Sequence, residues 1–127
     1  MAATWETVCA IAAALPATEL DPPPRDNPAW RVHGKVLVRR NPRLRIPDEA
    51  ALRQERGEPI AVHLERDERD LLVASDPDTF FFTPHWASSP SVLVWLDRVD
   101  PDLLRELITD AWRARAPKRL VRELDGR

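Results

Sequence analysis

The chain has 127 residues, of which 43% are hydrophobic and 31% charged, and its formal net charge at pH 7 is −2. This length fits one compact domain over residues 1–127, and the composition excludes a disordered or collagen-like chain. The near-neutral balance excludes a global attraction to polyanions, so any contact with nucleic acid must rest on local basic patches.

The first predicted element is a helix over residues 5–15. Its apolar residues recur at helical spacing, Thr4 is suited to cap its beginning, and Pro16 ends the pattern. The proline-rich segment 21–28 follows as an extended connector, because proline donates no backbone hydrogen bond. This connector is too short to separate two domains.

The middle of the chain predicts strands interrupted by a surface helix. Two strands are expected at 30–33 and 35–39, on either side of Gly34. Residues 48–56 form a short helix that is polar almost all round, which indicates a surface excursion. Alternating apolar residues then predict a strand over 58–64.

The next segment predicts a second helix followed by two strands. The helix covers residues 65–76 and ends before a proline. Its inward residues are expected to be Leu71, Leu72 and Ala74. The aromatic, uncharged stretch that follows predicts strands at 79–83 and 91–96.

A long helix near the C-terminus completes the pattern, and either Asp97 or Asp100 can cap it. Its apolar stripe consists of Leu104, Leu107, Ile108, Ala111 and Trp112. Pro117 ends or kinks the helix, and one more helical turn follows. The order helix, strands, helix, two strands, helix predicts a two-layer α+β domain with a mainly antiparallel sheet and helices on one face.

No catalytic or metal-binding pattern is evident in the sequence. Cys9 is the only cysteine, which excludes an intrachain disulfide, and the three histidines lie too far apart to form a local metal motif. Three glycines are too few for a phosphate-cradling loop. We therefore expect a protein that is not an enzyme and that uses no metal or cofactor. No stretch is apolar enough to suggest a membrane span or a signal peptide, which favours a cytoplasmic protein.

The segment Thr83–Trp86, with the sequence TPHW, is the most unusual local feature. An imidazole beside an indole can contact a ring-shaped ligand, so one hypothesis is a small-molecule or peptide pocket near this loop. The residues of that pocket are Trp30, His33, Thr83, His85 and Trp86. The other interpretation is structural, with Trp86 covering the edge of the sheet.

Basic residues gather in two blocks. The first block contains Arg25, Arg31, Lys35, Arg39, Arg40, Arg43 and Arg45. The second contains Arg113, Arg115, Lys118, Arg119 and Arg122. If the fold brings the blocks together, they form a surface able to contact phosphates; otherwise each is a solvated face balanced by acidic segments.

Several segments together carry a family resemblance. They are TWETVCAIAAALP at the start, WRVHGKV at 30–36, ASDPDTFFFTPHW at 74–86, VLVWLDRVDPDLLRELITDAW at 92–112, and APKRL at 116–120. In their order and spacing they resemble the MmcQ/YjbR family. The resemblance implies a small α+β fold and a DNA-binding function, for which a double-wing arrangement has been proposed.

The leading hypothesis is a non-enzymatic, cytoplasmic DNA-binding protein that contacts the phosphate backbone and is favoured to be a monomer. Its phosphate contacts are expected from Lys35, Arg39, Arg40, Arg43, Lys118 and Arg119. The small-molecule or peptide pocket is the alternative, and an interaction module acting through an exposed sheet edge is a third possibility.

Overall fold

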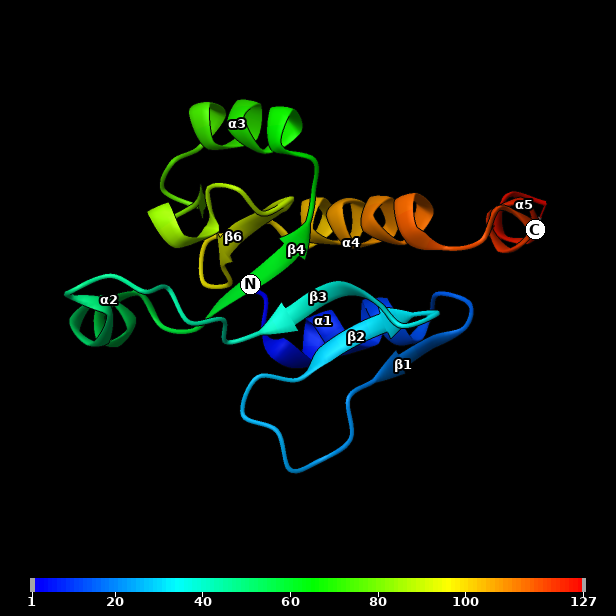
Figure 1. The fold of residues 1–127 in the computed structure, drawn as a ribbon, viewed down its shortest axis with the longest axis horizontal. Helices are drawn as coiled ribbons and strands as arrows, with labels where there is room; N and C mark the ends of the chain where they lie inside the picture. The colour runs from blue at the N-terminus through cyan, green and yellow to red at the C-terminus, as the bar shows by residue number, and fades with distance from the viewer. Residues whose placement is uncertain (1, 127) are drawn as a thin grey trace.

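The computed structural model describes residues 2–126 and contains, over that range, five α-helices, one short 3-10 helix and six strands (Figure 1). In chain order these are α1 (Trp5–Ala13), β1 (Thr18–Leu20), β2 (Ala29–Val32), β3 (Lys35–Arg40), α2 (Glu49–Arg56), β4 (Pro59–His63), α3 (Arg66–Ser75), β5 (Phe80–Phe81), the 3-10 helix η1 (Pro84–Trp86), β6 (Ser91–Trp95), α4 (Pro101–Arg115) and α5 (Lys118–Asp125).

The described strands form one antiparallel sheet in the order β1-β2-β3-β4-β6-β5. The α+β class and the antiparallel sheet are therefore confirmed. Strands β2 and β3 form a hairpin in which Val32 pairs with Lys35. The two turn residues, His33 and Gly34, have φ angles of 48° and 79°. Positive φ at both turn positions is the conformation that matches the twist of a hairpin.

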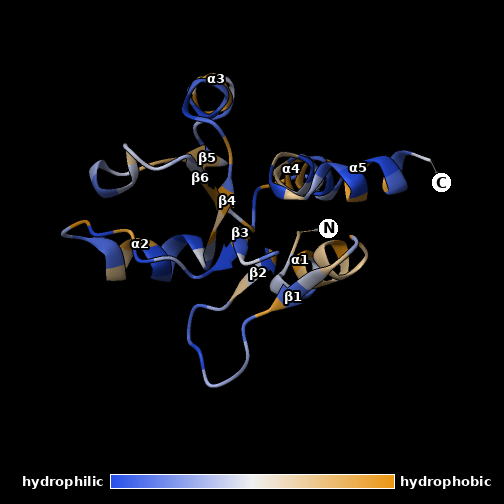
Figure 2. Ribbon diagram, turned by 45° about the vertical axis from the view of Figure 1, so that its right-hand side comes forward, coloured by the Kyte–Doolittle hydropathy of each residue, from blue (hydrophilic) through white to orange (hydrophobic). Residues whose placement is uncertain are grey.

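The main hydrophobic core lies between one face of the sheet and the helices α1 and α4. All five residues of the predicted α4 stripe are buried, and Thr4 caps α1 with its side chain. Trp112 is completely buried, and its Nε1 donates a 2.9 Å hydrogen bond to the carbonyl oxygen of Pro16. Figure 2 shows the central strand β4 in hydrophobic colours and much of α3 and α5 in hydrophilic colours.

A second, smaller hydrophobic cluster covers the opposite face of the sheet. Its buried members are Leu44, Ala61, Leu93 and Trp95. Leu52 of α2 packs against this cluster, so α2 does not share the face of α1 and α4. The expectation that the helices lie on one face fails for α2, because both faces of β4 and β6 are apolar and need covering.

The prediction for the inward face of α3 is wrong for two of its three residues. Leu71 is 73% exposed and Ala74 is also exposed, whereas the side chain turned fully inward is Arg69, at 3% exposure. Leu72 and Val73 lie half-buried against the main core. Because residues three and four positions apart share a helix face, the face that includes Arg69 excludes residues 71 and 74.

The strands differ from the prediction at two places. The strand expected over 79–83 is reduced to the two residues of β5, because Thr83 already begins the 3-10 turn. The short edge strand β1 was not predicted. It is only three residues long and its residues are half-buried or exposed, so it has no apolar alternation to reveal it.

Candidate functional site

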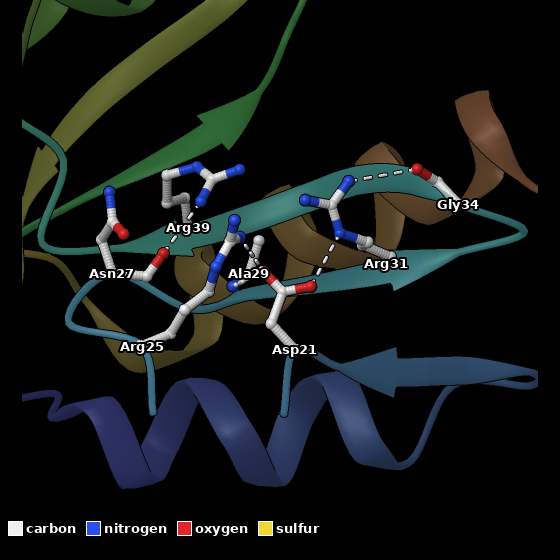
Figure 3. Close-up of polar contacts among 7 residues, drawn as sticks. All are labelled: Asp21, Arg25, Asn27, Ala29, Arg31, Gly34 and Arg39. Carbon is white, nitrogen blue, oxygen red and sulfur yellow. Dashed lines mark hydrogen bonds and ion pairs between the residues drawn. The ribbon is translucent and has the colours of Figure 1, made fainter. Parts of the chain in front are cut away.

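Three arginines gather on the sheet near its β1 edge. We call Arg25, Arg31 and Arg39 the arginine cluster. Asp21 accepts a 2.9 Å hydrogen bond from Nη1 of Arg25 and another of 2.9 Å from Nε of Arg31. Figure 3 shows the Arg25 and Arg31 side chains converging on Asp21, with Arg39 beside them over β3. Arg25 and Arg31 thus share one carboxylate, and Arg39 beside them forms no ion pair with any described residue, which leaves an excess of positive charge.

The local charges shift the pKa values of this cluster. The hydrogen bond from Arg31 is the largest influence on Asp21 and, with those from the Ala29 amide and Arg25, lowers its pKa from 3.8 to about 2 despite partial burial. Arg39 donates a 2.8 Å hydrogen bond to the carbonyl oxygen of Asn27. Burial lowers the pKa of Arg39, and the positive charges of Arg31 and Arg25 lower it further. Arginine nevertheless stays protonated at neutral pH.

The predicted phosphate contacts on β3 fall on different faces of the sheet. Arg39 pairs with Ala61 of β4 on the face of the second cluster. Arg40, one position later, points to the other face because side chains alternate along a strand. There its Nε lies 2.6 Å from a carboxylate oxygen of Glu58, and its guanidinium lies 5.5 Å from the centre of the Trp5 ring. Lys35 is exposed at the start of β3.

The remaining predicted contacts are spread over the molecule. Arg43 is exposed in the loop after β3, and with Arg25 and Arg53 it lines an open hollow of about 440 Å³. Lys118 and Arg119 are exposed in the first turn of α5, which lies beyond the end of α4 in Figure 1. The structure therefore does not gather the six residues in one place.

Arg39 of the first basic block and Arg115 of the second line the same cleft, which lies between β3 and β4. The two strands pair through only three residue pairs and then diverge (Figure 1). The resulting cleft, of about 310 Å³, is called the β3–β4 cleft. It is lined by Val36, Arg39, Ala61, His63, Trp86, Ser89, Pro90, Ser91 and Arg115. Arg39 and Arg115 thus share one cavity although they lie far apart in sequence.

The polar groups of the β3–β4 cleft are only partly satisfied. Among the described residues Arg39 and Arg115 form no ion pair, and Nε of Arg115 is buried without a hydrogen-bond partner. Burial, followed by the positive charge of Arg115, lowers the pKa of His63. Glu65 is the acidic side chain in reach of His63, at 3.8 Å, and its own side chain is 70% exposed.

The five residues of the predicted TPHW pocket do not line one cavity together. Trp30 packs against the main core, and its indole nitrogen is buried without a partner. His33 lies in the β2–β3 turn. His85 is exposed, and the centre of its ring lies 6.0 Å from the centre of the Trp86 ring in an edge-to-face arrangement. Thr83 is buried, and Trp86 alone of the five reaches the β3–β4 cleft.

Arg69 holds the loop that carries Trp86, a role that sequence reasoning missed. Its Nη1 donates hydrogen bonds to the carbonyl oxygens of Trp86, Ala87 and Ser89, at 3.3, 3.1 and 3.1 Å. Its guanidinium also lies 4.1 Å from the centre of the Phe82 ring. Nothing in the ERDERD segment distinguishes this arginine from its neighbour Arg66, so no sequence signal could have identified it.

Two further features bear on function. Within residues 2–126 no group of three or more histidine, cysteine or acidic side chains is arranged to hold a metal ion. Over the same residues, no helix has the length and apolarity to cross a membrane.

Comparison with known proteins identifies relatives over nearly the whole chain. The YjbR family model matches residues 13–114. Uncharacterised proteins of Mycobacterium tuberculosis and Mycobacterium bovis are 38% identical over 125 residues, which covers 94% of this chain and 93% of each relative. A crystal structure of Deinococcus radiodurans protein DR2400, whose family-model domain is DUF419, aligns with a TM-score of 0.65 at 16% identity. That alignment covers 87% of this chain and 76% of the other, and it supports the fold alone.

Proposed function

This chain belongs to the YjbR family, and we propose that it binds duplex DNA without sequence preference, through the phosphate backbone. The observation that carries the proposal is the arginine cluster, in which the carboxylate of Asp21 pairs with Arg25 and Arg31 while Arg39 beside them has no ion pair with a described residue. A polyanion placed over this surface neutralises the excess positive charge and releases its own counterions.

The geometry of the cluster suits phosphate oxygens. A guanidinium has five N–H donors in a fixed fork, and no arginine of the cluster uses more than two of them within the protein. Asp21 fixes the position of Arg25 and Arg31, which reduces the conformational entropy lost when they bind a phosphate. The open hollow beside Arg25 extends the basic surface to Arg43 and also contains Asp26, whereas Arg53 in the same hollow is paired with Glu49 at 3.0 Å.

Backbone contacts of this kind provide affinity but not sequence recognition. We therefore expect weak binding that decreases steeply as salt increases. Binding of this kind requires no catalytic group, and we also propose that this protein is not an enzyme. We further propose that it acts as a monomer in the cytoplasm, with no membrane partner.

The proposal is tested by titrating a labelled duplex with the wild-type protein and with the double variant R31Q/R39Q at about 50 mM salt. The matched control is R105Q/R122Q, which removes the same charge from helices α4 and α5, where both side chains are exposed. We expect the first variant to weaken binding by about tenfold or more and the control to change it little. Absence of wild-type binding, or equal losses in the two variants, would refute the proposal.

A further inference from the structure

The β3–β4 cleft exists because β3 pairs with β4 only over its last three residues. Val38, Arg39 and Arg40 pair with β4, whereas the first half of β3 pairs only with β2. On the other side, β4 stays paired with β6 as far as His63, which lies opposite Ser91. The divergence leaves a cavity in the sheet, and its wall is completed by Arg115 at the end of α4 and by the loop from Trp86 to Pro90.

Two arginines place positive charge in this cleft. Arg39 and Arg115 both line it, and neither forms an ion pair with any described residue. Nε of Arg115 is buried and has no hydrogen-bond partner. A buried donor without a partner raises the free energy of the folded protein. An oxyanion in the cleft can accept hydrogen bonds from the guanidinium groups of Arg39 and Arg115, so these groups favour such a ligand.

The rest of the wall is suited to an apolar group. Val36, Ala61 and Pro90 contribute aliphatic surface, and Trp86 contributes an indole. The hydroxyl groups of Ser89 and Ser91 lie 3.1 Å apart in the same wall. A volume of about 310 Å³ is at the small end of ligand pockets. The cleft therefore has room for one compact ring but not for an extended polymer.

We propose that the β3–β4 cleft binds a small organic anion, in which a carboxylate or phosphate head group is joined to a compact aromatic body. Arg39 and Arg115 hold the head group, and Val36, Pro90 and Trp86 contact the ring. This site is separate in chemistry from the backbone binding proposed above, with which it shares only Arg39. Arg69 acts here as a positioning residue, because it holds the carbonyl groups of the loop that carries Trp86.

Isothermal titration calorimetry with four probes tests this proposal on the full chain. Phenyl phosphate and benzoate contain both parts of the expected ligand, whereas inorganic phosphate lacks the ring and benzyl alcohol lacks the charge. We expect the first two probes to bind and the last two to bind at least about tenfold more weakly, because each forfeits one half of the site. Equal binding of inorganic phosphate and phenyl phosphate, or no binding of either aromatic anion at millimolar concentration, would overturn the proposal.

Variants then locate the site. R115Q removes one of the two guanidinium groups. S91L keeps both arginines but fills the cleft with a larger side chain. Each variant is expected to weaken phenyl phosphate binding by about tenfold or more. The matched control R122Q removes a charge from α5 and should leave binding unchanged. Equal effects of R115Q and R122Q would place the ligand elsewhere and contradict the proposal.

The same variants separate this site from DNA binding. R115Q should leave the affinity for duplex DNA within about twofold, and R31Q should leave phenyl phosphate binding intact, since Arg31 does not line the cleft. A loss of phenyl phosphate binding in R31Q equal to that in R115Q would show that the small anion binds at the arginine cluster instead, and would refute the cleft as its site.

Discussion

The hydroxyl group of Thr83 donates a 2.8 Å hydrogen bond to the carbonyl oxygen of Leu44, 39 positions earlier in the chain. Both residues are buried. A second bond runs in parallel, from Nε1 of Trp86 to the carbonyl oxygen of Arg43, at 2.8 Å. Together they fasten the TPHW loop to the segment after β3. Thr83, which the sequence suggested as a ligand contact, therefore has a structural role.

The first prediction concerns the variant T83V. It keeps the shape of the side chain but leaves the buried Leu44 carbonyl without a donor, so we expect it to lower the free energy of unfolding by about 1–3 kcal/mol. Urea denaturation measures this change. T83S, which retains the hydroxyl group, should lose clearly less; equal losses in the two variants would mean that the hydrogen bond contributes little.

The second prediction concerns Arg69. R69M removes the donor shared by three carbonyl groups of the loop, and we expect it to destabilise the protein by about 3 kcal/mol. R66M is the matched control, because Arg66 lies exposed in the same helix. Thermal unfolding of both variants provides the comparison. A midpoint for R69M that matches that of R66M would contradict the role assigned to Arg69.

These two contacts illustrate what the sequence can and cannot predict. Helical spacing identified the buried stripe of α4, and alternation identified the central strands, because both patterns are local consequences of one buried face. The bond from Thr83 to Leu44 depends instead on how distant strands pair. No local pattern specifies the order β4-β6-β5, so the surroundings of Thr83 were not predictable.

The candidate site shows the same division. The basic block 25–45 was evident from composition, but strand alternation separates Arg39 from Arg40, and an ion pair with Glu58 partly neutralises Arg40. Asp21 reaches Arg31 only through the pairing of the unpredicted strand β1 with β2. The meeting of Arg39 and Arg115 likewise depends on the early divergence of β3 from β4.

The third prediction follows from the pKa of Asp21, which is lowered from 3.8 to about 2. A carboxyl group whose pKa is lower in the folded state stabilises the fold above its unfolded pKa, and this contribution is lost as the pH falls toward the folded value. We expect D21N to be less stable than the wild type at pH 7, with the difference shrinking between about pH 4 and pH 2. D26N, which alters an exposed carboxylate, is the control. A difference independent of pH would contradict this assignment.

The fourth prediction concerns His63, whose pKa is lowered by burial and by the charge of Arg115. The folded protein resists protonation of this imidazole, whereas the unfolded chain protonates it near the ordinary value of 6.5. Stability should therefore fall as the pH drops below about 6.5, and H63Q should lose less over the same range. Chemical denaturation at a series of pH values measures both slopes. Identical slopes in the two proteins would rule out His63 as the source.

The dependence of duplex affinity on salt tests the arginine cluster most directly. For B-DNA, the logarithm of the binding constant falls with the logarithm of salt concentration by about 0.9 for each phosphate neutralised. Three contacts from Arg25, Arg31 and Arg39 predict a slope of about −3, and R31Q/R39Q should reduce it to about −1 while R105Q/R122Q leaves it unchanged. A slope that is the same in the wild type and in R31Q/R39Q would contradict DNA binding through this cluster.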